Sequence, residues 1–399
     1  MSLQNETAVN GQQISDLFAK YFHSTFSSPY GNFHAGHMTI KELNIPNSVS
    51  LNTICINKTK INKLLKSLDL NKSGGPDLIP PIFIVNCCKE LSEPLFILFK
   101  RSIAEGVVPK IWKQAYITPV HKKGNTTKIE NYRPISKLCL FAKVFEKVVY
   151  QQVYNSISPI LSDAQHGFLI KRSTVTNLIL TNNYISKGMD IGLQVDCVYT
   201  DYSKCFDRID HQILLKKLAM SGIHGDLLRW FSSYIENRSQ AVVLNGFMST
   251  WLPVPSGVPQ GSLLGPLLFI IFVNDIEKCF LYSKVLSYAD DMKILKFISS
   301  TDDTMLLQSD LERFETYCNI NKLDLNVSKC FFVSFTRKSD TINGGYHLKG
   351  TSLARVYEAC DLGIIQGSKL IYDKHISSII TRALKPWDLS SAVIVPSTA

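Results

Sequence analysis

The sequence lacks the features that mark several large classes of protein. Its ten cysteines include no CxxC pair and follow no regular spacing, and no secretory signal opens the chain. The longest apolar run near the middle, residues 263–273, is too short to span a bilayer. These absences argue against a disulfide-rich secreted protein and against a membrane protein. We expect an intracellular protein, cytoplasmic or nuclear, with reduced and mostly buried thiols and no membrane partner.

Repeats and common ligand-binding patterns are also absent. The sequence has no internal repeat and no long low-complexity segment. His34 and His37 form an HxxH pattern without further ligands nearby, which favours a surface loop over a zinc site. Gly257, Gly261 and Gly265 are not followed by the GK[ST] ending of a P-loop, so we expect them to allow close backbone approach to another group instead.

Positive charge is present in excess and is unevenly spread. The 399 residues carry a net charge of +10, and residues 60–190 contain 19 Lys and Arg against 9 Asp and Glu. That segment alone accounts for the whole excess. A basic segment of this kind suggests a polyanionic partner, most simply nucleic acid, although a solvated surface would give the same count.

Hydrophobic periodicity predicts an α+β fold for a chain that is 45% apolar. An amphipathic helix at 14–26 precedes a linker at 27–50, and a basic loop is expected at 122–134. Further helices are expected at 61–68, 90–106, 131–153, 211–222, 226–238, 263–278 and 303–319. Strands are expected at 115–121, 193–202, 240–246, 250–257 and 330–337, with a hairpin at 280–297.

Two consecutive acids, Asp290 and Asp291, interrupt the apolar hairpin stretch. The pattern predicts both carboxylates at the hairpin tip, where like charges repel unless cations neutralise them. An ordinary Asp-Asp turn gives the same local pattern. Asp201, 89 residues earlier, lies near the end of the buried strand expected at 193–202 and supplies a third carboxylate.

One carboxylate from a strand and two from a neighbouring hairpin would form a site for two divalent ions. Mg²⁺ prefers such oxygen ligands and keeps coordination positions for substrate phosphates. Two ions about 3.5–4 Å apart can activate a 3′-hydroxyl and stabilise a leaving pyrophosphate. Asp207 and Asp210 compete for this role; we interpret Asp210 as a helix N-terminal acid and Asp207 as a supporting or structural group.

A series of sequence blocks lies within residues 60–376. The blocks are SGGPDLIP (73–80), WKQAYITPVHKKG (112–124), NYRPIS (131–136), QHGFLIKRSTVTNL (165–178), TDYSKCFD (200–207), SGVPQGSLLGPLLFIIFVND (256–275), YADD (288–291), LDLNVSKC (323–330) and CDLGI (360–364). In content and order they resemble the reverse transcriptases of non-LTR (LINE-type) retrotransposons, in particular the jockey-like elements. YADD alone would be weak support, whereas the ordered series is specific.

The resemblance implies roles for individual residues. By resemblance, Asp201, Asp290 and Asp291 are the catalytic acids that bind two Mg²⁺ ions, with Mn²⁺ as an alternative. The nucleotide would be bound by Lys122, Lys123, Arg133, Phe206, Gln260 and Gly261. Arg172 would contact the phosphate backbone, and Asp361, Leu362 and Gly363 would form the turn that grips the primer end.

Some of these roles have plain structural alternatives. Phe206 resembles a steric gate that excludes the 2′-hydroxyl of a ribonucleotide; without the motif, a core aromatic would be the preferred interpretation. Lys122 and Lys123 could belong to a solvated basic loop. Lys329 matches a lysine of a later block without a defined role. Cys205 stands where the family usually has a small Ala.

The resemblance also implies an architecture and partners. It predicts a right-hand polymerase fold with an antiparallel palm sheet: an N-terminal helix and linker (1–57), a fingers-rich part (58–192), a palm (193–367) and a truncated thumb (368–399). The implied activity is RNA-directed DNA polymerisation with an RNA template, a DNA primer and dNTPs. We expect a fragment of a mobile element without its endonuclease region, for which that region or an element-encoded RNA-binding protein would be a further partner. The main alternative is a catalytically inactive nucleic-acid-binding remnant; a second is the palm of an intron-encoded or cellular RNA polymerase.

Overall fold

The computed structural model describes residues 1–3, 6–27 and 49–391. The backbone separates into two compact units. Unit 1 comprises residues 1–162, 204–275 and 320–324, and unit 2 comprises residues 163–203, 276–319 and the chain from 325 onward. His34, His37 and most of the expected linker lie outside the described residues.

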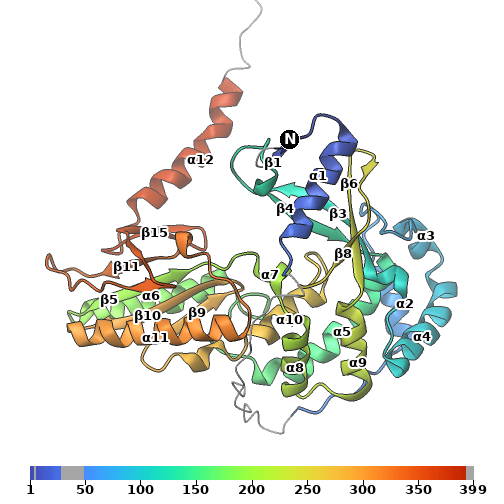
Figure 1. Cartoon of the computed structure of the whole chain (residues 1–399), viewed down its shortest axis with the longest axis horizontal. Helices are drawn as coiled ribbons and strands as arrows, with labels where there is room; N and C mark the ends of the chain where they lie inside the picture. The colour runs from blue at the N-terminus through green and yellow to red at the C-terminus, as the bar shows by residue number, and fades with distance from the viewer. Residues whose placement is uncertain (4–5, 28–48, 392–399) are drawn as a thin grey trace, which may run out of the picture. The chain divides into compact units, whose positions relative to one another are not determined.

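Unit 1 is a mixed sheet with helices packed around it (Figure 1). The strand order is β4-β3-β6-β7, with β8 also paired to β6; β3 is antiparallel to β4 and parallel to β6. The strands are β3 (Gln114–His121), β4 (Tyr132–Lys137), β6 (Arg238–Leu244), β7 (Phe247–Met248) and β8 (Leu252–Val254), with a short ribbon of β1 (Ser2–Leu3) and β2 (Glu6–Thr7). The helices are α1 (Gly11–Ser24), α2 (Lys58–Lys66), α3 (Pro81–Asn86), α4 (Cys88–Glu105), α5 (Leu140–Ile157), α7 (Cys205–Arg208), α8 (His211–Met220), α9 (Gly225–Ile235) and α10 (Leu264–Val273).

The amphipathic helix expected at the N-terminus is confirmed as α1 and covers this sheet. Asn10 caps the helix by accepting a hydrogen bond from the Gln13 N–H. Phe18 and Phe22 are fully or almost fully buried in a cluster that includes Ile117 of β3. The apolar stripe of the helix therefore packs on the sheet, as its periodicity predicted.

The helix expected over 131–153 is wrong at its N-terminal end. Residues 132–137 form β4, and α5 begins only at Leu140. Pro134 sits opposite Pro119 of β3, and β4 is an edge strand, where a missing proline N–H costs no ladder hydrogen bond. The local sequence favours a helix because it continues without a break into the apolar residues of α5. Pairing with β3 nevertheless makes residues 132–137 a strand.

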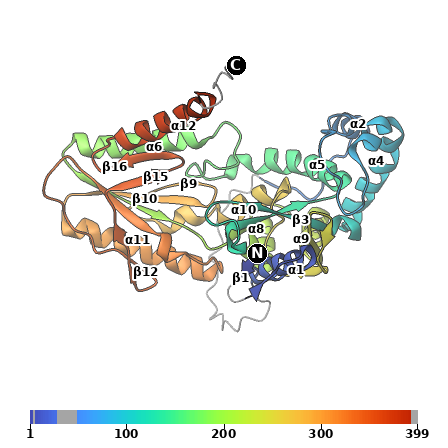
Figure 2. The same cartoon turned by 90° about the horizontal axis from the view of Figure 1, so that it is seen from above.

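Unit 2 is a sheet in the order β14-β11-β5-β10-β9, antiparallel from β11 to β9 with β14 added in parallel. Figure 2 shows α6 and α11 on opposite sides of this sheet. Its strands are β5 (Gln194–Thr200), β9 (Lys284–Tyr288), β10 (Asp291–Ile298), β11 (Phe331–Phe335) and β14 (Ala354–Arg355), with hairpins of β12 (His347–Leu348) and β13 (Thr351–Ser352), and of β15 (Glu358–Asp361) and β16 (Ile364–Gly367). Its helices are α6 (Thr174–Asp190), α11 (Thr301–Ile320) and α12 (Asp373–Ser391).

The centre of unit 2 is β5, whose residues are buried at every position. Val195, Cys197 and Tyr199 pack in one cluster with Ile185 and Met189 of α6. Because side chains alternate along a strand, the intervening residues face the other side of the sheet. The strand is therefore buried on both faces, although its sequence, LQVDCVYTDY, intersperses polar residues among the apolar ones.

Most of the other expected elements are confirmed. The strands expected at 115–121, 193–202 and 330–337, the hairpin at 280–297 and the helix at 303–319 all occur within a few residues of their expected limits. The helix expected at 263–278 ends at Val273, and a 3₁₀ turn (Ile276–Cys279) follows. Asp210 caps α8 as expected, accepting from the Gln212 and Ile213 N–H groups.

The thiol and membrane expectations can also be compared with the structure. All ten cysteines lie within the described residues, none of them forms a disulfide, and six are buried. Over the part of the chain that the structure describes, we find no helix with the length and apolar character needed to cross a membrane.

Candidate active site

The strand register of unit 2 places Asp201 across from Asp291. Thr200, the last residue of β5, pairs with Met292 of β10 in antiparallel register. Continuing that register by one residue sets Asp201 opposite Asp291, and directly opposed residues point to the same face. On the other side of β5, Phe331 pairs with Tyr199, and the chain after Asp201 is held by a hydrogen bond from the Asn326 N–H to the Asp201 carbonyl at 2.9 Å.

The β9–β10 hairpin closes through a two-residue turn, Ala289-Asp290. Tyr288 pairs with Asp291, and Ala289 has φ of 56° whereas Asp290 is not among the positive-φ residues. Positive φ at the first turn position only is the pattern of a type II′ turn, which normally has glycine there. The alanine is therefore held in a backbone conformation that costs free energy. Asp290 is half-buried and Asp291 is exposed.

Asp201 and Asp291 line one cavity of about 190 Å³ within unit 2. Two lysines, Lys293 and Lys329, also line it, together with Asp361 at the end of β15 and Leu362 of the β15–β16 turn. Asp290 is not among the residues that line the cavity. The structure thus brings two of the three predicted acids to one concave surface, with the third beside them in the chain.

The Asp201 carboxylate already attracts a cation within its own unit. Lys329 Nζ lies 3.0 Å from Asp201 Oδ2, and the two side chains are 60% and 31% exposed. A pair this exposed contributes only about 0–1 kcal/mol to stability, because water screens it. The contact shows, however, that positive charge is accommodated beside Asp201.

Lys293 and Asp361 form a buried ion pair at the same cavity. Lys293 Nζ lies 2.7 Å from Asp361 Oδ2, the side chains are 3% and 4% exposed, and Asn177 also accepts a hydrogen bond from the lysine. Asp361 was predicted to act at the primer end. Its carboxylate is almost fully buried and paired with Lys293, and a contact of this residue with a primer stays a prediction.

Leu362 and Gly363 form the two-residue turn between β15 and β16. Asp361 pairs with Ile364, and both turn residues have positive φ, 46° and 92°. Two positive φ values define a type I′ turn, for which glycine at the second position removes the steric cost. The turn expected at this block is confirmed; its contact with a primer stays a prediction.

In unit 1, Gln260 is fixed by Asp207. Gln260 Nε2 donates to Asp207 Oδ1 at 2.6 Å, and Asp207 is only 4% exposed. Burial raises the pKa of Asp207, and the Gln260 hydrogen bond partly offsets that rise. Gly261 has φ of 111°, and a Cβ there would lie 2.9 Å from the Ser136 carbonyl oxygen, so glycine is required by both conformation and space.

Phe206 is half-buried and its ring stacks on Phe269 of α10. The centroids are 4.7 Å apart and the rings are 20° from parallel. Phe269 is fully buried. This packing is compatible with both predicted roles, because one ring face can rest on the core while the other remains outside it.

The basic residues predicted to bind phosphates differ in their surroundings. Lys122, Lys123 and Arg133 are exposed in unit 1 on and beside β3 and β4. Arg172, in unit 2, donates to the Asp163 carboxylate at 2.5 Å and to the carbonyls of Asp163 and Gln165 at 3.0 and 2.7 Å. Its guanidinium thus already organises the protein chain.

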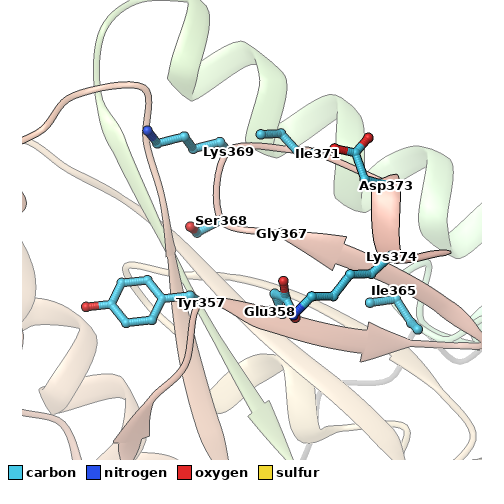
Figure 3. Close-up of a pocket in the computed structure, with 9 residues that line it drawn as sticks. All are labelled: Tyr357, Glu358, Ile365, Gly367, Ser368, Lys369, Ile371, Asp373 and Lys374. Atoms are coloured by element: carbon cyan, nitrogen blue, oxygen red, sulfur yellow. The ribbon is translucent and has the colours of Figure 1, made fainter. Parts of the chain in front are cut away.

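A second cavity of unit 2, about 330 Å³ in volume, lies beside the β15–β16 hairpin and the start of α12 (Figure 3). In Figure 3 the side chains of Glu358 and Lys374 approach each other, and their ion-pair distance is 2.6 Å. None of the residues predicted for the site lines this cavity. It therefore has no part in the chemistry proposed below.

The donor set at Asp201 and Asp291 suits a hard divalent cation. Within the described ranges, no group of three or more His, Cys, Asp and Glu side chains is arranged to hold a metal ion. Mg²⁺, however, is commonly bound through one or two carboxylates together with substrate phosphates, and it keeps several waters. Two carboxylates on one cavity fit that mode of binding.

Comparison with known proteins identifies the family. The family model described as reverse transcriptase (RNA-dependent DNA polymerase) matches residues 120–357, more than half of the chain. The chain belongs to the reverse transcriptase family. This confirms the resemblance inferred from the ordered blocks, and the mixed α+β fold agrees with it.

Several curated relatives are proteins of non-LTR retrotransposons. The chain is 29% identical to the RNA-directed DNA polymerase from mobile element jockey of Drosophila melanogaster, over 84% of this chain and 38% of that protein. It is 28% identical to the probable RNA-directed DNA polymerase from transposon BS of the same species, over 94% of this chain and 43% of that protein. It is 23% identical to the Pol polyprotein of the R2 element of Popillia japonica, over 58% of this chain and 34% of that protein. The chain thus spans about two fifths, or less, of the length of these relatives of the reverse transcriptase family.

Sequence reasoning missed two residues that build the site. Gln165 belongs to the QHGF block, but its role was missed because its hydrogen bonds join it to Ala289, 124 residues away in the sequence. Lys293 had a local signal, since it is a lysine within the buried strand MKILKF. A buried lysine requires a partner, but periodicity does not say that the partner is Asp361.

Proposed function

We propose that this chain is an RNA-directed DNA polymerase of a non-LTR retrotransposon, which adds deoxynucleotides to a DNA primer on an RNA template. The observation that carries the proposal is the pair Asp201 and Asp291, which line one cavity from adjacent strands in a chain of the reverse transcriptase family. Asp201, Asp290 and Asp291 would hold two divalent cations, Mg²⁺ or Mn²⁺, and these would supply positive charge to the nucleotide phosphates and the primer hydroxyl.

The remaining roles are assigned to this chain's own side chains. Lys122, Lys123 and Arg133 would donate to the triphosphate, for which exposed cations are suited. Phe206 would limit the space at the sugar. Gln260, held by Asp207, and the close backbone at Gly261 would contact the nucleotide. Arg172 and the Asp361–Gly363 turn would contact the nucleic acid, the latter without the Asp361 carboxylate.

The proposal includes the architecture expected from the sequence. Residues 58–192 would contribute mainly to fingers, residues 193–367 to the palm, and the chain from 368 to the start of a thumb. The basic segment, residues 60–190, supports a polyanionic template and primer. An intracellular site of action, in cytoplasm or nucleus, and partnership with an endonuclease region or an element-encoded RNA-binding protein stay predictions.

Primer extension tests the proposal. The full chain is mixed with a DNA primer on an RNA template and dNTPs, with and without Mg²⁺. We expect Mg²⁺-dependent extension, and a loss of at least about 10²–10³-fold for Asp290→Ala. Asp302→Asn, an exposed acid in the first turn of α11 in the same unit, is the matched control and should extend at the wild-type rate.

The inactive-remnant alternative gives a different result. The inactive-remnant hypothesis predicts that the chain binds the primer–template but does not extend the primer at any Mg²⁺ concentration. Asp290→Ala removes one of two adjacent like charges, and its melting temperature shows whether the variant folds. Wild-type extension by a folded Asp290→Ala protein would refute the assigned role of Asp290.

A further inference from the structure

The Gln165 side chain lies against the turn that precedes Asp290. Its Oε1 accepts a hydrogen bond from the Ala289 N–H at 2.8 Å, and its Nε2 donates to the Ala289 carbonyl at 3.3 Å. One side chain thus pairs both backbone polar groups of Ala289. Gln165 is only 4% exposed, so water is a poor substitute for these bonds.

The backbone around Gln165 is itself fixed along β9. The Ser287 N–H donates to the Ala164 carbonyl, and the His166 N–H donates to the Ser287 carbonyl, both at 2.8 Å. Gln165 Oε1 also accepts from the Gly167 N–H at 2.7 Å, which sets the orientation of the amide. The segment therefore extends the edge of the sheet and positions Gln165 over the hairpin turn.

Gly167 permits the close approach. A Cβ at this position would lie 2.2 Å from the Ala289 nitrogen and 2.8 Å from its Cα. No side chain fits between these two backbones. Backbone contact at Gly167 and side-chain contact at Gln165 therefore act on the same residue of the turn.

Ala289 needs this support because its conformation is strained. Its φ of 56° is unfavourable for a residue with a Cβ, and such conformations persist only where the surroundings over-determine them. Asp290 and Asp291 follow directly. A relaxed Ala289 would redirect the next peptide and move both carboxylates relative to Asp201.

We propose that Gln165 is a positioning residue, which holds the Ala289 turn and thereby sets the Asp290 and Asp291 carboxylates for divalent cations. The proposal rests on the proposed function for the reaction that these cations serve, whereas its geometry lies wholly in unit 2. Groups that orient metal ligands typically change metal affinity or activity by about 10–100-fold when they are removed.

The test compares Gln165→Met with Gln194→Met. Gln194 lies in the same unit, is also 4% exposed, and also makes three hydrogen bonds, to Asp196 and to both backbone groups of Ile342. It pairs with Ile298, at the end of β5 opposite to Thr200. Both variants remove a buried side-chain amide, but only the amide of Gln165 contacts the Ala289 turn.

The main readout is Mn²⁺ binding to the full chain, followed by electron paramagnetic resonance, with thermal melting beside it. We expect Gln165→Met to raise the Mn²⁺ dissociation constant by about 10–100-fold and Gln194→Met to leave it nearly unchanged, at similar melting temperatures. The Mg²⁺ concentration for half-maximal primer extension should rise in the same way. Equal Mn²⁺ affinity in wild type and folded Gln165→Met overturns the proposal.

Gly167→Ala is the second variant, because it displaces the turn while every hydrogen-bonding group of Gln165 remains. It should also weaken Mn²⁺ binding, and an unchanged affinity in the folded variant counts against the proposal. If neither variant folds while Gln194→Met does, Gln165 has only a folding role and the proposal fails. A wild-type chain that binds Mn²⁺ but extends no primer refutes the proposed function alone.

Discussion

The buried Lys293–Asp361 pair shows how a single residue supports the candidate site. Both partners are almost fully enclosed, and both line the cavity that contains Asp201 and Asp291. Replacing such a pair by apolar residues can be neutral, whereas removing one partner leaves a buried charge without compensation. The pair therefore specifies the local arrangement more than it adds stability.

Lys293→Met should lower the free energy of unfolding by about 3–5 kcal/mol, because it leaves the Asp361 carboxylate buried and unpaired. Urea unfolding measures this loss. Lys296→Met is a suitable control on the same strand, since Lys296 lies 3.7 Å from Asp303 and both side chains are more exposed. A loss for Lys293→Met no larger than for Lys296→Met would contradict the importance of the pair.

A substitution at Phe206 can distinguish its two predicted roles, a steric gate at the sugar and a core aromatic. If its ring limits the space at the sugar, Phe206→Val should admit ribonucleotides, with about tenfold loss of discrimination for each 1.36 kcal/mol. The measurement is the ratio of rGTP to dGTP incorporation. If the ring serves only the core beside Phe269, the variant loses stability, by up to about 3–5 kcal/mol for a full truncation, and the ratio does not change.

The two hairpins show which elements sequence could predict. Two apolar runs that meet at Asp290 and Asp291 within 280–297 predicted β9 and β10, and the DLG block predicted the β15–β16 turn. The β4 strand was missed, because a strand on a sheet edge tolerates Pro134 and its local pattern leads directly into α5. Here a tertiary pairing decided the local structure.

The start of α8 gives a prediction for pH. His211 donates to the Gly257 carbonyl at 2.8 Å, and burial lowers the pKa of His211, with smaller opposing effects of that hydrogen bond and of Asp210. The unfolded chain therefore takes up the proton at a higher pH than the folded chain. Stability from this group is present above the unfolded pKa, about 6.5, and is lost as the pH falls through the lower folded value.

Urea unfolding of wild type and His211→Gln at about pH 7.5 and about pH 5.5 measures this effect. Wild type should lose more stability than the variant over this interval, by at most about 1.4 kcal/mol per pH unit below 6.5. Comparing the two proteins cancels the contributions of other groups to the pH dependence. His166 is one such group, because burial also lowers its pKa. Identical losses in the two proteins would mean that His211 titrates normally in the folded chain.

At the scale of the whole molecule, the basic excess in residues 60–190 predicts steep salt dependence. Log affinity for a primer–template should fall with log salt by about 0.7–0.9 for each phosphate neutralised. Replacing exposed Lys122 and Lys123 by Ala should reduce this slope, and Arg172→Ala should reduce it if Arg172 leaves Asp163 to bind phosphate. An affinity that does not depend on salt would indicate that the basic residues only form a solvated surface and do not bind phosphates.

The ordered blocks located the family and the acids, but not the contacts that position them. Gln165 and Ala289 are 124 residues apart, and Lys293 and Asp361 are 68 residues apart. Local periodicity describes which residues are buried and says nothing of which distant partners they meet. Each of the two compact units likewise combines segments that are far apart in the sequence.

The most direct test of the account is the addition of one deoxynucleotide to a DNA primer on an RNA template, at saturating Mg²⁺, by wild type, Asp201→Asn and Asp291→Asn. The two acids lie on neighbouring strands and line the same cavity. We predict a loss of at least about 10²–10³-fold in rate for each variant, with melting temperatures close to that of wild type. Addition at the wild-type rate by either folded variant would contradict the claim that this cavity is the site of nucleotide transfer.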